Sequence, residues 1–259
     1  MPRLVLAVVL ALATVFGPLP ARAKGIVLDP RLHHLRAGDE REWSDFPAKA
    51  EGPRLALRFK SAPNAAEWAL RLRQQDVKQT WKVRLNDKEI ARLPPDENDM
   101  VVYFPVPAGA LRAGDNELVI EPVGRLPDDV RVGDVALDER PVAEVLSEAT
   151  VEVTVREPGL TGKDAPVPCR LTVLDDRGAL TTVGAASGEG RAVRPGVVYT
   201  ADGRARFGLP AGDYTIRAGR GFAYGTDSVR VTLKAGDTAR KSLTLRREVP
   251  TDGWVCSDT

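Results

Sequence analysis

Short runs in which apolar and polar residues alternate recur along the chain after its first two dozen residues. Clear examples are RLALRFK, TWKVRLNDKEIARL, MVVYFPVP and NELVIEP. Alternation with a period of two puts every second side chain on one face of a β-strand, so each run predicts a half-buried strand. Long stripes with the period of a helix do not occur. The pattern therefore predicts an all-β fold, and many short strands favour β-sandwiches.

Glycine and proline separate these runs, with 23 glycines and 20 prolines in the chain. Both residues interrupt regular structure, so they mark the turns between strands. The Asn86-Asp87 pair between WKVRL and KEIARL predicts a short hairpin turn.

The strands fall into two consecutive sets. The second set opens with TVEVTVRE near Thr150, and the segment RPVAEVLSEA before it lacks strand alternation. We expect a sandwich in residues 24–143, a linker in 144–149, a second sandwich in 150–247 and a closing segment in 248–259.

The first 23 residues, MPRLVLAVVLALATVFGPLPARA, have a basic start, a short apolar run and a small-x-small site. This order predicts a signal peptide cleaved after Ala23, and hence a secreted or periplasmic protein. The alternative is an uncleaved anchor helix, which the short apolar run disfavours. No other membrane-spanning segment is expected.

The charge balance limits the partners that we expect, and the cysteine content limits the possible disulfides. Lysine plus arginine total 37 and aspartate plus glutamate total 36, so no excess charge favours nucleic acid or an anionic bilayer. The two cysteines, Cys169 and Cys256, leave two alternatives. Cys169 lies in phase with apolar residues of VPCRLTVLDD, which favours a buried free thiol, but an exported protein can also keep a disulfide between the two.

Three segments of the first set are WKVRLNDKEIARL, FPVPAGALRAGDNELVIEP and DDVRVGDVALDERP. Together they resemble a galactose-binding-like jelly roll of the kind attached to secreted glycosidases. In the second set, RPGVVYTADGRARFGLPAGDYTIRAG and VRVTLKAGDTARKSLTLRR resemble a carboxypeptidase-regulatory-like, transthyretin-like sandwich.

The closing segment LTLRREVPTDGWVCSDT resembles the junction at which secreted PHP-type metallohydrolases of the CehA/McbA-like branch enter their catalytic domain. Gly253, Trp254 and Asp258 match that lead-in, and the metal-binding His-x-His pair that follows it in the family is not in this sequence. The resemblance implies a non-catalytic accessory half that positions or shields a catalytic domain absent from this chain. The alternative is a stand-alone exported protein that binds carbohydrate or a cell-surface glycan.

The residues themselves predict no catalytic, cofactor-binding or metal-binding site. His33 and His34 are the only histidines, and we expect them to be solvated, because strand neighbours point to opposite faces and cannot readily share one ion. Trp43, among charged neighbours in REWSDF, is the candidate ligand-binding residue. Trp68 and Trp81 fall within alternating strands and are expected in the core.

Two further segments have ordinary explanations. Asp96, Glu97 and Asp99 in PPDENDM supply oxygen ligands of the type that calcium prefers, but they lack the spacing of a calcium loop, so a polar hairpin tip is favoured. AGRGFAYG lacks the spacing and the following helix of a phosphate-binding loop, so it is expected to be a plain glycine-rich loop.

Overall fold

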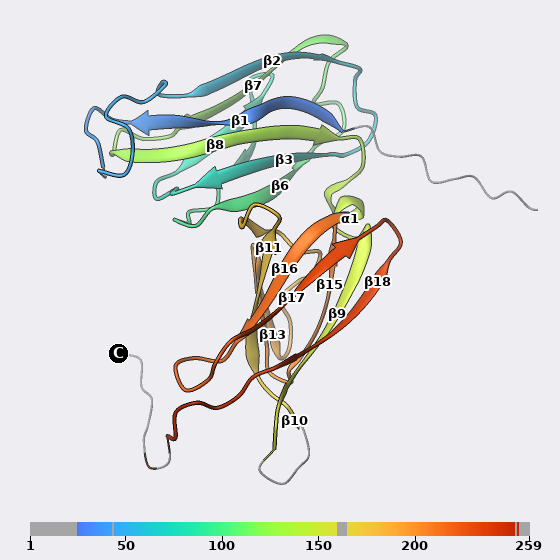
Figure 1. Cartoon of the computed structure of the whole chain (residues 1–259). Coiled ribbons are helices and arrows are strands. Elements are labelled where there is room, and N and C mark those ends of the chain that lie inside the picture. The colour runs from blue at the N-terminus through green and yellow to red at the C-terminus, as the bar shows by residue number, and fades with distance from the viewer. Residues whose placement is uncertain (1–24, 43, 160–164, 252, 254–259) are drawn as a thin grey trace, which may run out of the picture.

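The alternating runs form strands, and the described part of the molecule is almost entirely β (Figure 1). The computed structural model describes residues 25–42, 44–159, 165–251 and 253. The predicted signal peptide and Trp43, Trp254 and Cys256 lie outside these residues. The all-β prediction is confirmed, and the one helix among the described residues is the single turn α1 (Val142–Val145).

Eight strands build the first sandwich. They are β1 (Ile26–Ala37), β2 (Leu55–Ser61), β3 (Trp68–Gln75), β4 (Trp81–Leu85), β5 (Lys88–Arg92), β6 (Met100–Val106), β7 (Gly114–Pro122) and β8 (Asp128–Asp138). One sheet has the order β1-β8-β3-β6 and the facing sheet the order β2-β7-β4-β5. Strands distributed between two four-stranded sheets in this way form a jelly roll, as the sequence predicted.

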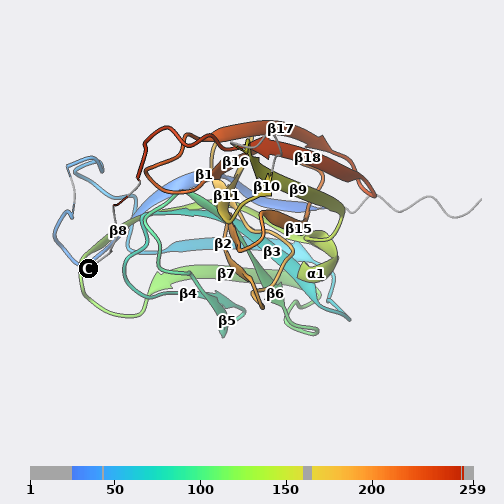
Figure 2. The same ribbon diagram turned by 90° about the horizontal axis from the view of Figure 1, so that it is seen from below.

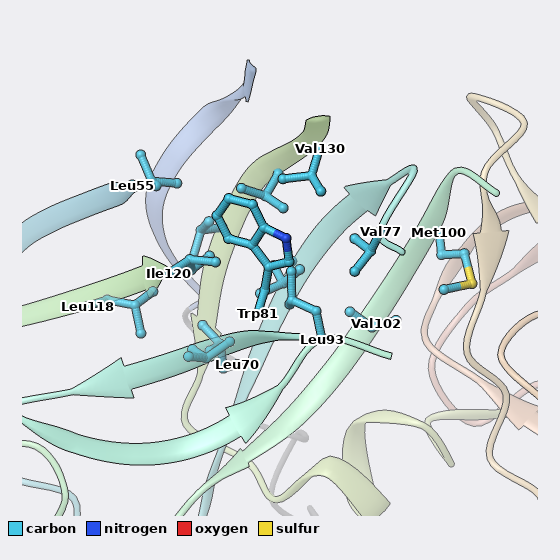
Figure 3. Close-up of a cluster of buried hydrophobic side chains, with 14 of the residues drawn as sticks. Leu55, Leu70, Val77, Trp81, Leu93, Met100, Val102, Leu118, Ile120 and Val130 are labelled. Carbon is cyan, nitrogen blue, oxygen red and sulfur yellow. The ribbon is translucent and has the colours of Figure 1, made fainter. Parts of the chain in front are cut away.

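Trp81 lies at the centre of the first core (Figure 3). It is fully buried, and its indole Nε1 donates a hydrogen bond of 2.7 Å to Asp128 Oδ2. Trp68 is partly buried against the same cluster. Both tryptophans therefore pack as core residues, as their phase in the strands indicated.

The Asn86-Asp87 turn joins β4 to β5, as predicted. Both residues have left-handed backbone angles, with φ of 49° and 70°, which a two-residue hairpin turn requires. The Asn86 amide is buried and donates to Asn116 Oδ1 at 2.6 Å, so the turn is tied to the start of β7.

The second sandwich contains ten strands. They are β9 (Ala149–Glu157), β10 (Ala165–Pro166), β11 (Cys169–Asp175), β12 (Leu180–Thr181), β13 (Arg191–Arg194), β14 (Val197–Thr200), β15 (Arg204–Leu209), β16 (Gly212–Gly219), β17 (Asp227–Leu233) and β18 (Thr238–Thr244). In one sheet β9 pairs with β15 and, in parallel, with β18. In the other, β11 lies between β14 and β16, and β17 follows β16.

The segment between the sandwiches differs in structure from a plain linker. Residues 140–149 contain α1, which lies between the two sandwiches (Figure 1) and, seen from below, close to β6 (Figure 2). Val145 and Leu146 are buried, and α1 contacts β3 and β6 of the first sandwich. The segment lacks strand alternation because it forms a helical turn that packs by burying these two side chains.

Candidate functional site

Backbone hydrogen bonds, an ion bridge and apolar side chains join the two sandwiches. The two-residue strand β12 pairs in parallel with β6, so one sheet continues from the first sandwich into the second. Leu180 N–H donates to Asp99 O at 2.8 Å, and Thr182 N–H donates to Val101 O at 3.1 Å. We call this contact the seam.

An ion bridge lies beside these backbone bonds. Asp134, on β8, accepts a hydrogen bond from Arg71 Nη2 of the first sandwich at 3.0 Å and another from Arg177 of the second. Burial alone would raise the pKa of Asp134, but the two arginines outweigh burial and hold this pKa below its ordinary value. The carboxylate is therefore charged at neutral pH and links both sandwiches.

Apolar side chains also pack across the seam. Leu180 and Val197 belong to the second half of the chain, yet both pack in the core cluster of the first sandwich. On the other side of the seam, the carbonyl of Leu146 approaches Gly184 and Gly208 so closely that neither position has room for a Cβ atom. Backbone, ionic and apolar contacts thus all cross between the sandwiches.

A cleft of about 440 Å³ lies at the seam, with walls from both sandwiches. Arg71, Tyr103 and Asp138 line it from the first, and Thr181 and Tyr214 from the second. Burial raises the pKa of both tyrosines, so their hydroxyls stay neutral. The arginines of the cleft are already paired with carboxylates, so it offers hydrogen-bonding groups, two aromatic walls and the carboxylates of Asp176 and Asp213.

The prediction that both histidines are solvated is wrong, because both are buried. His33 lies between two carboxylates, with Nδ1 2.7 Å from Glu51 Oε2 and Nε2 2.9 Å from Asp29 Oδ2. His34 Nε2 lies 2.5 Å from Asp129 Oδ1. Asp29 is a near neighbour of His33 in the sequence, whereas Glu51 and Asp129 lie 18 and 95 residues from their histidines. The carboxylates satisfy both ring nitrogens of His33 and Nε2 of His34, while the buried His34 Nδ1 has no hydrogen-bond partner among the described residues.

The two histidines do face opposite sides of β1. In the β1–β8 strand pair, His33 lies opposite Val132, whose side chain is in the core, and His34 lies opposite Arg131 on the other face. The His34 ring packs on the Phe46 ring, with the two ring centroids 4.9 Å apart. The histidines therefore fasten the loop after β1 to the sheet. No group of three or more His, Cys, Asp or Glu side chains that could hold a metal occurs among the described residues.

The remaining sequence candidates have local roles. Trp43 lies outside the described residues. Asp96 Oδ1 accepts the Asn98 N–H at 2.9 Å and so closes its own turn, whereas Asp99 pairs with Arg73. Cys169 is a buried free cysteine whose pKa burial raises to about 11; Cys256 lies outside the described residues.

No protein-family model matches the sequence, and no curated protein matches it. Solved structures are similar at low identity. The minor pilin GBS52 of Streptococcus agalactiae is 14% identical over 87% of this chain and 100% of its own, with a TM-score of 0.33. A β-glucuronidase of Bifidobacterium dentium is 12% identical over 85% of this chain and 49% of its own, with a TM-score of 0.30.

A third similar structure is the TIE protein of Bacillus anthracis, which is 13% identical over 89% of this chain and 41% of its own, with a TM-score of 0.27. This chain spans about half of the length of the glucuronidase, 49%. Among the described residues, no helix has the length and apolar character needed to cross a bilayer.

Proposed function

We propose that this chain is an exported, non-catalytic module that positions a partner domain joined to its carboxyl end. The main observation in support of this proposal is the seam. A module of two sandwiches can orient a partner only if the sandwiches keep a fixed mutual geometry, and the seam joins them by backbone, ionic and apolar contacts. Sandwiches joined by a flexible linker alone would lack this property.

The exit of the last strand supports the same role. Arg247 Nη2 donates to the Tyr224 hydroxyl at 2.8 Å, and that hydroxyl donates to Glu157 Oε2 at 3.2 Å. The N–H groups of Glu248 and Val249 both donate to the Ala223 carbonyl, at 2.9 and 3.2 Å. The direction in which the chain leaves the second sandwich is therefore fixed as far as Val249.

The resemblance of residues 248–259 to the lead-in of PHP-type metallohydrolases names the partner that we propose, a metal-dependent hydrolase domain. The predicted signal peptide supports a secreted or periplasmic location, and N-terminal sequencing of exported protein should then begin at Lys24. No residue of this chain is assigned a catalytic role.

The test is to read the genomic DNA beyond codon 259 and to express the longer product with and without residues 24–247. The proposal expects a His-x-His segment downstream and metal-dependent hydrolysis that falls when the two sandwiches are removed. A stop codon directly after codon 259, or a catalytic domain whose activity does not depend on the sandwiches, would overturn it.

The seam cleft favours a second candidate, an exported carbohydrate-binding protein. Its two tyrosines and its hydrogen-bonding side chains are the kind of lining that suits a sugar. Titration calorimetry of the full chain with oligosaccharides tests this candidate, with Trp43→Ala and Thr181→Val as variants. Loss of binding in Thr181→Val alone would assign the ligand to the cleft, and loss in Trp43→Ala alone to the first sandwich.

A further inference from the structure

A row of arginines crosses the outer face of one sheet of the second sandwich. Arg170 on β11, Arg217 on β16 and Arg230 on β17 are all exposed. Their strands are neighbours: Arg170 lies opposite Gly219, Arg217 opposite Ser228 and Arg230 opposite Thr215. Residues offset by two positions on adjacent strands are diagonal neighbours on one face, so the three arginines follow one another across the sheet.

The row continues on the other side of β11. Tyr199 on β14 lies opposite Arg170, and the guanidinium of Arg194 lies 5.9 Å from the centre of the Tyr199 ring. From β13 to β17 the row crosses five strands, which corresponds to roughly 19 Å at the usual spacing between strands. Its members are Arg194, Tyr199, Arg170, Arg217 and Arg230, and we call them the arginine row.

None of the four arginines in the row forms an ion pair with a carboxylate of the described residues. The opposite sheet of the same sandwich differs, because Glu152 there lies 2.9 Å from Arg240 and 3.6 Å from Arg206. Two carboxylates lie beside Arg230 at the end of the row: Asp176 and Asp213 line a shallow hollow with it, and Asp213 accepts a hydrogen bond from Thr232. The charge of the row is thus left available to an external anion.

A hollow of about 680 Å³ adjoins the row, and it too is basic. Arg170, Arg191 and Arg220 line it together with Tyr199 and several glycines, and none of its lining residues is a carboxylate. Gly219 and Gly221 bring the backbone close to the hollow without side chains. The glycine-rich loop that the sequence left without a function therefore forms part of this basic surface.

We propose that the arginine row and its adjoining hollow bind a linear anionic polysaccharide through its carboxylate groups. Separated guanidinium groups match a polymer with repeating charge better than they match a single small anion, and each can hold a carboxylate by two parallel hydrogen bonds. The Tyr199 ring, 37% exposed, offers a flat surface to a sugar ring.

Other polyanions fit less well. Single-stranded nucleic acid binds to successive aromatic platforms, and the row has one aromatic ring. Membrane insertion needs a broad apolar surface, whereas Phe222 is a single exposed aromatic in the loop beside the hollow. The inference concerns only the second sandwich and is independent of the positioning role, so either can fail without the other.

The experiment measures binding of the full exported chain to immobilised polygalacturonate. The test variant is the triple substitution Arg170→Gln, Arg217→Gln and Arg230→Gln. The matched control is Arg204→Gln, Arg206→Gln and Arg240→Gln, which removes the same charge from the opposite sheet. Neutral dextran, single-stranded DNA and phosphatidylglycerol vesicles are the comparison ligands.

We expect polygalacturonate binding that weakens with added salt, falls by about tenfold or more in the test variant and stays within about twofold in the control. Neutral dextran should not bind. Absence of binding by the unmodified chain, an equal loss in both triple variants, or tighter binding to DNA or to vesicles would overturn the proposal. Thermal unfolding of each variant shows whether it is folded.

Discussion

Asp128 and Asp129 are chain neighbours on β8, both are fully buried, and their pKa values shift in opposite directions. Burial dominates at Asp128 and raises its pKa despite hydrogen bonds from backbone N–H groups and from Trp81. At Asp129 burial also acts to raise the pKa, but donors from Glu42, His34 and Arg36 outweigh it. The difference in pKa follows from charge: the Arg36 guanidinium reaches only Asp129, whereas the charged neighbour of Asp128 is the carboxylate of Glu42.

Substitution of Asp129 tests whether this carboxylate fastens the loop after β1. Asp129→Asn keeps the shape but leaves Arg36 and His34 without a buried anion, so the free energy of unfolding at pH 7 should fall by about 3 kcal/mol. Urea unfolding measures the change, with the exposed Asp115→Asn as control. A loss below about 0.5 kcal/mol, the usual range for a surface substitution, would contradict this role.

The same residue predicts the direction of the pH dependence. Because its folded pKa lies below its unfolded value, Asp129 stabilises the protein above the unfolded pKa, and this contribution is lost as the pH falls through the folded pKa. The stability gap between the unmodified chain and Asp129→Asn should therefore narrow below about pH 4. If the difference in free energy of unfolding between the two proteins stays constant down to pH 3, the charge of Asp129 is not the cause of that difference.

Cys169 should be nearly inert in the folded protein. Burial raises its pKa to about 11, so little thiolate forms at pH 8, and the side chain is shielded from reagents. Iodoacetamide followed by mass spectrometry should label Cys169 only after denaturation. If denaturation without a reductant leaves it unlabelled, the cysteine is in a disulfide, the alternative that the sequence left open.

At the scale of elements, two glycines allow α1 to approach the second sandwich. A Cβ atom at Gly208 would overlap the Leu146 carbonyl, so Gly208→Ala must displace either β15 or the end of α1. We expect a loss of about 1–3 kcal/mol, the usual cost of overpacking. Gly188→Ala is the matched control, because a Cβ atom there meets no other atom within 4 Å. Equal melting temperatures for the two variants would contradict a close contact.

Local patterns predicted the strands but not how distant segments meet. Alternation located β4, β7 and the hairpin at Asn86, because each pattern is contained in a few consecutive residues. The two residues of β12 carry no such pattern, and their pairing with β6 depends on how the sandwiches are stacked. The burial of His34 was missed for the same reason, since its partner Asp129 is 95 residues away.

At the scale of the whole molecule, Asp134 should govern how firmly the two sandwiches are coupled. Asp134→Asn removes the charge that Arg71 and Arg177 share, while the backbone bonds of β12 remain. We therefore expect both sandwiches to stay folded but the seam to open more often, which hydrogen exchange of the Leu180 and Thr182 amides would detect. Arg58→Gln, which breaks an exposed pair with Glu117, is the control. Unchanged exchange at the seam would contradict the role of Asp134.

Deleting residues from the carboxyl end of the chain tests where the second sandwich ends as a folding unit. The contacts that fasten the chain after β18 lie before residue 250: Arg247 bonds to Tyr224, and Glu248 and Val249 bond to Ala223. Deletion of 250–259 removes the exposed hydrogen bond from Arg247 to Thr251. The melting temperature should then stay within about one or two degrees, less than the several degrees that 1 kcal/mol produces in a domain of this size.

A longer deletion, of residues 246–259, provides the contrast, because it removes Arg247 from both Tyr224 and Glu157 and exposes the Tyr224 ring. This variant should melt several degrees lower. Differential scanning calorimetry of the two truncations and the full chain separates the outcomes. If the shorter deletion already lowers the midpoint as much as the longer one, residues 250–259 complete the second sandwich, and a lead-in role for them is excluded. If only the longer deletion does so, the sandwich ends at the Tyr224 contact, and the segment beyond it is free to join a following domain.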